Sequence, residues 1–118
     1  MILYDRYGKP TAFCDDDTHI FLFSGEPVAY FYGDTVYSFR GKLLGWFDSG
    51  WVRDLKGYCV FFWDKATGCG PCKYTKGVTP TKGIKRTIPV KMTREIRKTR
   101  AVNLLSWSPL SGEAFFRQ

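Results

Sequence analysis

Four glycines divide the first half of the chain into units of nearly one length. Their spacings are 17, 16 and 16 residues, and they are Gly8, Gly25, Gly41 and Gly57. The fifth residue after each glycine is aromatic: Phe13, Tyr30, Trp46 and Phe62. The fifth residue before each is aliphatic: Leu3, Ile20, Val36 and Val52. Two strands of about five residues and two short turns fill such a period, whereas a helical or βα repeat needs more. The sequence therefore predicts four tandem β-hairpins.

Turn residues separate the expected strands at two kinds of position. Gly8-Lys9-Pro10 and Gly25-Glu26-Pro27 lie inside units, where glycine tolerates a positive φ and proline fixes the following φ. Asp15-Asp16-Asp17, Gly33-Asp34 and Asp48-Ser49-Gly50 lie between units. The runs 28–32 and 60–63 are continuously apolar, so we expect both faces of the strands to be covered. Because one hairpin is unstable in water, the four must share a core.

The same residues resemble those of a known family. The resemblance is carried by Leu3-Tyr4-Asp5 with Gly8-Lys9-Pro10, by the run 25–30, by Val36-Tyr37 with Gly41 and the run 44–47, and by Gly50-Trp51-Val52 with Asp54 and Gly57. Residues 105–108 with Phe115-Phe116 look like the family's tail. The pattern is similar to the 4-fold beta flower domain over about residues 1–64. The resemblance implies an all-β fold with four-fold pseudosymmetry, and it brings no catalytic or binding residues.

Charge and aromatic content divide the chain into two halves. Residues 1–64 contain six Lys/Arg and nine Asp/Glu, whereas residues 65–118 contain twelve and two. Seventeen of the 21 aromatic residues lie in the first half. We therefore expect a β domain at 1–64, a basic linker broken by Gly and Pro at 65–103, and an apolar docking segment at 104–118.

The segment 73–100 is the main candidate for binding an anion. It contains one acid, Glu95, and ten basic residues: Lys73, Lys76, Lys82, Lys85, Arg86, Lys91, Arg94, Arg97, Lys98 and Arg100. Lys and Arg bind phosphates in a salt-sensitive, sequence-independent way. The alternative is a tail that is solvated or docked on the acidic repeats. Glycines and prolines predict an extended chain up to about residue 92, with its aliphatic side chains lying on something, and 93–105 is expected to form a short helix.

Four large apolar side chains follow this segment: Trp107, Leu110, Phe115 and Phe116. Ser108-Pro109 is typical of a helix start, with serine as the cap and proline in the first turn, and it predicts one helical turn within 110–116. Solvated tails are usually polar. We therefore expect the four side chains to be buried against the β domain or against a partner.

Two cysteines form a dithiol motif in Gly68-Cys69-Gly70-Pro71-Cys72-Lys73. Redox catalysis needs a helix after the motif, and Gly77 and Pro80 would stop one. Two such cysteines can also form half of a zinc site, but a closed site needs four ligands, and only Cys14, Cys59 and His19 remain to complete it. We expect reduced thiols in a surface turn, with no metal and no cofactor.

Carboxylates elsewhere have structural interpretations. Asp15-Asp16-Asp17 is expected to be a solvated turn, because consecutive carboxylates do not converge as calcium ligands do. Asp5 and Asp54 occupy equivalent positions in units one and four, and we expect them to cap turns rather than to act as an acid/base pair. His19, the only histidine, has no nucleophile partner in the pattern and is expected to be structural or exposed.

These features favour a non-enzymatic interaction or assembly module. Seventeen aromatics exceed what so small a core hides, and surplus apolar surface marks contacts with a protein partner or a second copy. The alternatives are nucleic-acid or polyanion binding through the basic tail and, more remotely, thiol redox activity at Cys69 and Cys72. A cytoplasmic protein with no membrane contact is expected, because Asp5 and Arg6 interrupt the N-terminus and no long apolar run follows.

Overall fold

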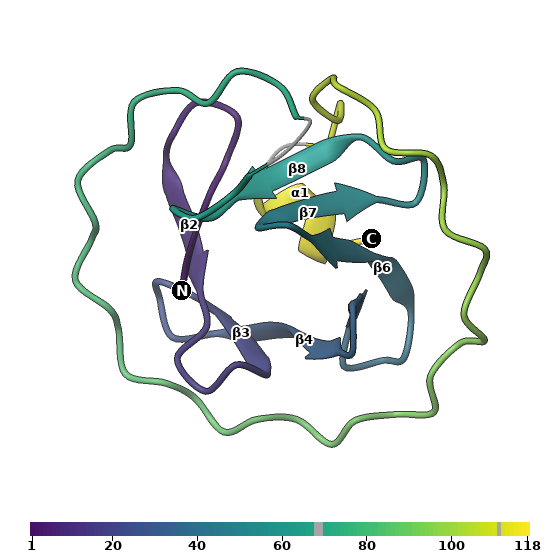
Figure 1. Cartoon of the computed structure of the whole chain (residues 1–118). Helices are drawn as coiled ribbons and strands as arrows, with labels where there is room; N and C mark the ends of the chain where they lie inside the picture. The colour runs from purple at the N-terminus through teal and green to yellow at the C-terminus, as the bar shows by residue number, and fades with distance from the viewer. Residues whose placement is uncertain (68–69, 111) are drawn as a thin grey trace.

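The computed structural model describes residues 1–67, 70–110 and 112–118. It contains eight strands and one short helix: β1 (Ile2–Tyr4), β2 (Pro10–Phe13), β3 (His19–Leu22), β4 (Pro27–Tyr32), β5 (Thr35–Tyr37), β6 (Leu43–Asp48), β7 (Trp51–Asp54), β8 (Cys59–Phe62) and α1 (Glu113–Phe116). Each strand pairs antiparallel with the next, and β8 pairs with β1 (Figure 1). The prediction of four hairpins is confirmed, and the hairpins close into a barrel.

The repeat positions explain the interior of the barrel. The aliphatic residue of each unit points inward and is at most 1% exposed: Leu3, Ile20, Val36 and Val52. Small residues face them from the second strands of the first three units: Ala12, Ala29 and Gly45. Eight short strands enclose room only for side chains, so small residues keep the barrel closed. In unit four the equivalent residue is Phe61, which fills the centre.

A turn inside each hairpin forms what we call a hairpin tip, and the four tips span residues 5–9, 22–26, 38–42 and 54–58. Each tip glycine has a positive φ, between 79° and 96°. The Asp5 carboxylate accepts hydrogen bonds from the backbone N–H groups of Tyr7 and Lys9. Asp54 accepts the same pair from Lys56 and Tyr58. The prediction that these two carboxylates cap turns is confirmed.

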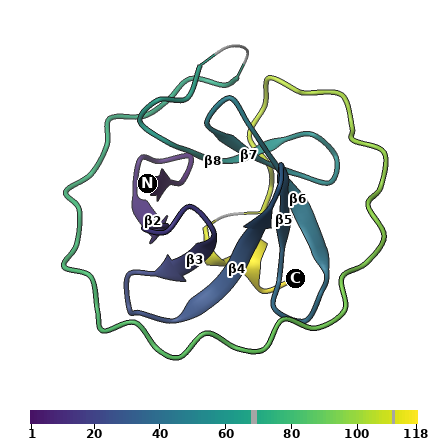
Figure 2. The same cartoon turned by 60° about the horizontal axis from the view of Figure 1, so that its bottom comes forward.

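The helix α1 packs into the barrel from the end where the hairpin tips lie. Phe115 and Phe116 are at most 5% exposed and contact Phe61, with ring centroids 5.9 and 5.3 Å apart. Figure 2 shows α1 within the outline of the strands. The prediction that Ser108 caps this helix is wrong, because Gly112 precedes it and the Ser108 hydroxyl donates to Asp54 instead.

Residues 70–105 encircle the barrel as an extended ring, which we call the belt (Figures 1 and 2). The molecule measures 36 × 35 × 22 Å, so its perimeter is about 110 Å, and 36 residues at about 3.3 Å each span about 120 Å. The predicted helix at 93–105 is therefore wrong for a physical reason. A helix rises only about 1.5 Å per residue, and a belt containing one would be too short to reach round the barrel.

No helix among residues 1–67, 70–110 and 112–118 is long and apolar enough to cross a membrane.

Candidate functional site

Backbone hydrogen bonds anchor the belt to the barrel in every unit. The Gly83 and Met92 N–H groups donate to the carbonyls of Phe23 and Phe39, at 2.6 and 2.9 Å, and one further bond recurs in all four units. In each, a belt N–H donates to the carbonyl of a tip glycine, over 2.8 to 3.1 Å: Gly77 to Gly8, Arg86 to Gly25, Glu95 to Gly41 and Leu104 to Gly57. The four donors are nine residues apart. Nine residues of belt therefore cross one sixteen-residue hairpin, and the belt follows the four-fold pseudosymmetry.

Belt cations lie over aromatic rings on the outer face of the barrel. Lys82 lies 4.7 Å from the centre of the Phe13 ring, and Lys91 lies 5.1 Å from that of Tyr30. The Arg94 guanidinium is 3.7 Å from the ring centre of Tyr32. Lys73 lies over Trp51 and Lys76 over Tyr4, each at 5.8 Å. Such contacts stabilise by about 0.5–1 kcal/mol at exposed sites.

Five of the ten candidate anion-binding residues also pair with barrel carboxylates at or beside the turns between units. Lys82 and Lys85 hold Asp15 at 3.0 and 3.2 Å. The other pairs are Lys76–Asp64, Arg97–Asp34 and Arg100–Asp48, at 2.5 to 2.9 Å. Arg86 and Lys98 are exposed and make no ion pair among the residues that the structure describes. Most of the belt's positive charge is therefore used to hold the belt in place.

The belt's aliphatic side chains face solvent, which is opposite to the expectation that they lie on the barrel. Every sixth residue is aliphatic and more than four-fifths exposed: Val78 (94%), Ile84 (92%), Val90 (87%), Ile96 (90%) and Val102 (81%). Conversely, the outward aromatics beneath the belt are at most 2% exposed: Phe13, Tyr30, Trp46 and Phe62. The chain itself therefore covers these aromatic side chains, which the sequence suggested were too many for the core. They do not form a free contact surface.

Two further charged residues hold the belt on the barrel, and this role could not be predicted from their charge. Glu95, the only acid in the segment 73–100, accepts a 2.6 Å hydrogen bond from the Leu43 N–H, and its carbonyl accepts one from the Tyr37 hydroxyl. Arg53 is 2% exposed at a position where the other units have an aromatic residue. Its guanidinium donates to the carbonyls of Gly57 and Leu104, at 2.9 and 2.7 Å. Arg53 therefore ties the end of the belt to unit four.

The basic residues of the belt repeat every nine residues, a pattern that the sequence alone already contains. Lys73, Lys82, Lys91 and Arg100 are nine residues apart, and so are Lys76, Lys85 and Arg94. The second series lies near the aromatic residue four positions before each tip glycine: Tyr4, Phe21 and Tyr37. In the first series, Lys82 and Lys91 lie over the equivalent residues Phe13 and Tyr30. The tail is therefore a second repeat that follows the first.

The apolar docking residues all contact the chain's own barrel. Phe115 and Phe116 are buried, whereas Trp107 and Leu110 are half-buried. Trp107 packs on Trp51 and Phe62, with ring centroids 5.9 and 6.2 Å apart. The backbone beside it pairs with β8, because the Cys59 N–H donates to Ser106 and the Cys59 carbonyl accepts from Ser108.

Among the remaining candidates, His19 makes polar contacts with neighbouring side chains. The His19 ring lies 2.6 Å from the Asp16 carboxylate and 2.8 Å from the Lys91 ammonium, and Asp16 also accepts the backbone N–H groups of Thr18 and His19. Among the described residues, no three His, Cys, Asp or Glu side chains gather as they would around a metal ion. Cys72 is exposed, and Cys69 lies outside the described residues, so the dithiol hypothesis stays untested.

Cysteine reactivity provides the first prediction. Burial raises the thiol pKa to about 11 for both Cys14 and Cys59. At pH 8 their thiolate fraction is then about a hundredfold lower than that of an ordinary thiol. We expect iodoacetamide to modify Cys72 rapidly and to modify Cys14 and Cys59 only after denaturation, as measured by peptide mass spectrometry. Equal labelling rates in the native protein would contradict the burial of these thiols.

The belt ion pairs provide the second prediction. The hydrogen bond from Lys82 lowers the pKa of Asp15, and that from Arg100 lowers the pKa of Asp48. A carboxyl whose pKa is lower in the folded state stabilises the fold above its unfolded pKa of about 3.9, and this contribution disappears as the pH falls through the folded pKa. Exposed pairs contribute only about 0.2–1 kcal/mol each.

A side-chain ¹³C titration by NMR measures these two carboxyl pKa values. Lys82→Gln should raise the titration midpoint of Asp15 and leave that of Asp48 unchanged. Arg100→Gln should raise the midpoint of Asp48 and leave that of Asp15 unchanged. Midpoints that do not respond to their own partner would show that the belt does not hold these carboxylates in solution.

The closed barrel of four pseudosymmetric hairpins, encircled and plugged by its own C-terminal half, defines the class of this protein. The model of the 4-fold beta flower protein family matches residues 1–116, which include the belt and α1. The chain belongs to this family. The comparisons with curated proteins and with solved structures found no match.

Proposed function

We propose that this chain is a non-enzymatic interaction module that binds a protein partner through the outer side of its belt. The observation that carries the proposal is the series of five aliphatic side chains, each more than 80% exposed, at every sixth belt residue. Single exposed apolar side chains scattered over a surface are normal. A regular series of them on one anchored segment is instead typical of a contact surface.

The belt's charge indicates what kind of surface it would meet. Arg86 and Lys98 lie exposed between the aliphatic side chains, and neither has an ion-pair partner among the described residues. Apolar contact combined with opposite charge favours a partner whose apolar surface is bordered by carboxylates. The proposal adds no catalytic step.

The test separates the outer side of the belt from the fold. Val78, Ile84, Val90, Ile96 and Val102 are each replaced by Thr, with Tyr7→Thr, an exposed residue on hairpin tip one, as the control. Because the five side chains are almost fully exposed, the melting temperature should change by only a few degrees, roughly the effect of 1 kcal/mol. Partners that co-purify quantitatively with wild type and with Tyr7→Thr should be lost from the five-fold variant. An unchanged partner profile would contradict the proposal.

Polyanion binding is the second candidate, favoured by the ten basic residues of the segment 73–100. A polyanion would reach Arg86 and Lys98 freely, but it would compete with barrel carboxylates for Lys82 and Arg100. If this function is correct, Arg86→Gln with Lys98→Gln should shorten retention on heparin at about 0.15 M salt. Unchanged retention would count against it.

A further inference from the structure

Clefts open between neighbouring hairpin tips, and they differ in size. The cleft between tips one and two has a volume of about 230 Å³, and that between tips two and three about 240 Å³. A third cleft, between tips four and one, has a volume of about 780 Å³. This volume is within the usual range for a small-molecule site, about 300–1,000 Å³. Of these three clefts, the one between tips four and one therefore departs from the pseudosymmetry.

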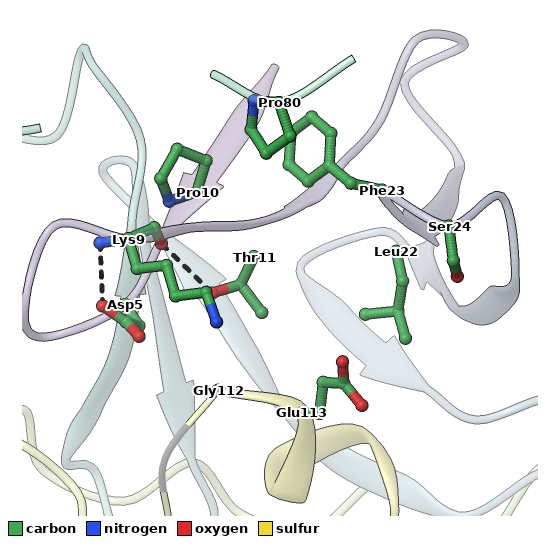
Figure 3. Close-up of a pocket in the computed structure, with 10 residues that line it drawn as sticks. All are labelled: Asp5, Lys9, Pro10, Thr11, Leu22, Phe23, Ser24, Pro80, Gly112 and Glu113. Atoms are coloured by element: carbon green, nitrogen blue, oxygen red, sulfur yellow. Dashed lines mark hydrogen bonds between the residues drawn. The ribbon is translucent and has the colours of Figure 1, made fainter. Parts of the chain in front are cut away.

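The path of the chain explains the larger volume. A belt proline lies in each of the small clefts, Pro80 in the first and Pro89 nine residues later in the second. Figure 3 shows Pro80 beside Phe23, across the first cleft from Gly112 and Glu113. The nine-residue period would bring Trp107 to an equivalent place in the large cleft, but there the backbone turns inward and pairs with Cys59. Among the described residues, none from the belt lines this cleft.

We propose that the cleft between tips four and one, here called the Trp107 cleft, binds a small amphipathic anion: a flat apolar body with one carboxylate or phosphate group. Its apolar wall comes from both tip four and the C-terminal segment: Leu55, Trp107, Pro109 and Leu110. Trp107 is half-buried, with Trp51 and Phe62 packed against it, which holds its ring in place. This site is separate from the outer side of the belt.

Two cations line the cleft from adjacent hairpin tips. Arg6 belongs to tip one and Lys56 to tip four, and neither makes an ion pair among the described residues. The one acidic side chain among the described lining residues, that of Asp54, belongs to a residue that is 6% exposed. Its carboxylate already accepts hydrogen bonds from two backbone N–H groups and, at 2.6 Å, from Ser108. The other charged side chains of the lining are cations, and they lie beside the apolar wall and the polar Tyr58 and Gln118. This combination favours an anion with an apolar body.

The experiment uses the full chain with a ¹⁵N label and follows the indole N–H signal of Trp107 by NMR. The probes share one ring system: 1-naphthylacetate, 1-naphthyl phosphate and the neutral 1-naphthaleneethanol. We expect saturable shifts of the Trp107 signal, with an affinity for at least one anion about tenfold or more above that for the alcohol. The better of the two anions identifies the head group.

Matched variants locate the charge. Arg6→Gln with Lys56→Gln should reduce the affinity for the anion about tenfold and leave the neutral alcohol unchanged. Lys9→Gln with Lys42→Gln removes two exposed cations of tips one and three that do not line this cleft, and it should change neither. All four side chains lie on the surface of the tips, so the fold should survive. No saturable shift, equal affinity for the anions and the alcohol, or an equal loss in the control variant would overturn the proposal.

Discussion

Phe115→Ala is expected to lower the free energy of unfolding by about 3–5 kcal/mol, the usual cost of removing a buried ring. Phe115 is fully buried and contacts Phe61 and Phe116, with ring centroids 5.9 and 5.4 Å away. The cavity would open at the centre of the barrel, because Phe61 fills the interior that small residues leave in the other units. A domain of this size is stable by only about 5–15 kcal/mol, so the loss is a large fraction of the total.

Urea unfolding at 25 °C, followed by tryptophan fluorescence, measures this loss. Glu113→Ala, an exposed substitution in the same helix, is the matched control and should change stability by no more than about 0.5 kcal/mol. A loss below about 1 kcal/mol for Phe115→Ala would mean that α1 rests on the barrel without completing its core.

Gly41→Ala is the second substitution with a large expected effect. Gly41 has φ of +89°, and a Cβ built there would overlap the carbonyl group of Thr93 in the belt. To make room the belt must move, which breaks the hydrogen bond from the Glu95 N–H to Gly41 and the one from Leu43 to the Glu95 carboxylate. We expect a loss of about 3 kcal/mol or more, from backbone strain and lost hydrogen bonds together.

Gly33→Ala provides the matched control for backbone strain. Gly33 also has a positive φ, +62°, but its Cβ would meet no atom within 4 Å. Gly33→Ala should therefore lower the free energy of unfolding only by the strain of a left-handed residue, about 1–2 kcal/mol. Equal losses for the two variants in thermal or urea unfolding would show that the belt does not press on the tip glycine.

The hairpins were predictable because their signal is local. Turn glycines, alternating side chains and a constant period lie within each unit, so residues 1–64 specify their own strands. The cover on the outer face was also expected from the runs 28–32 and 60–63. The sequence did not show that residues 70–105 supply this cover, because the contact between Lys82 and Phe13 spans most of the chain.

The C-terminal half was harder to interpret because its basic and aliphatic residues exchange their usual places. Lys and Arg side chains carry long apolar stems, and here they lie on aromatic rings while valines and isoleucines face solvent. Hydropathy alone predicts the reverse. The belt was recognisable only from the nine-residue spacing of its cations, which becomes meaningful once each is matched to a hairpin.

Hydrogen exchange of the belt amides in the native full-length chain tests the central claim, that the C-terminal half is part of the fold. The amides that bond to the tip glycines belong to Gly77, Arg86, Glu95 and Leu104, and those of Gly83 and Met92 donate to other barrel carbonyls. We expect the first four to exchange much more slowly than the belt amides that make no hydrogen bond to the barrel and to respond together to Gly41→Ala, because each is hydrogen-bonded to a tip glycine. Exchange of all four at the rate of an unstructured peptide would contradict the account.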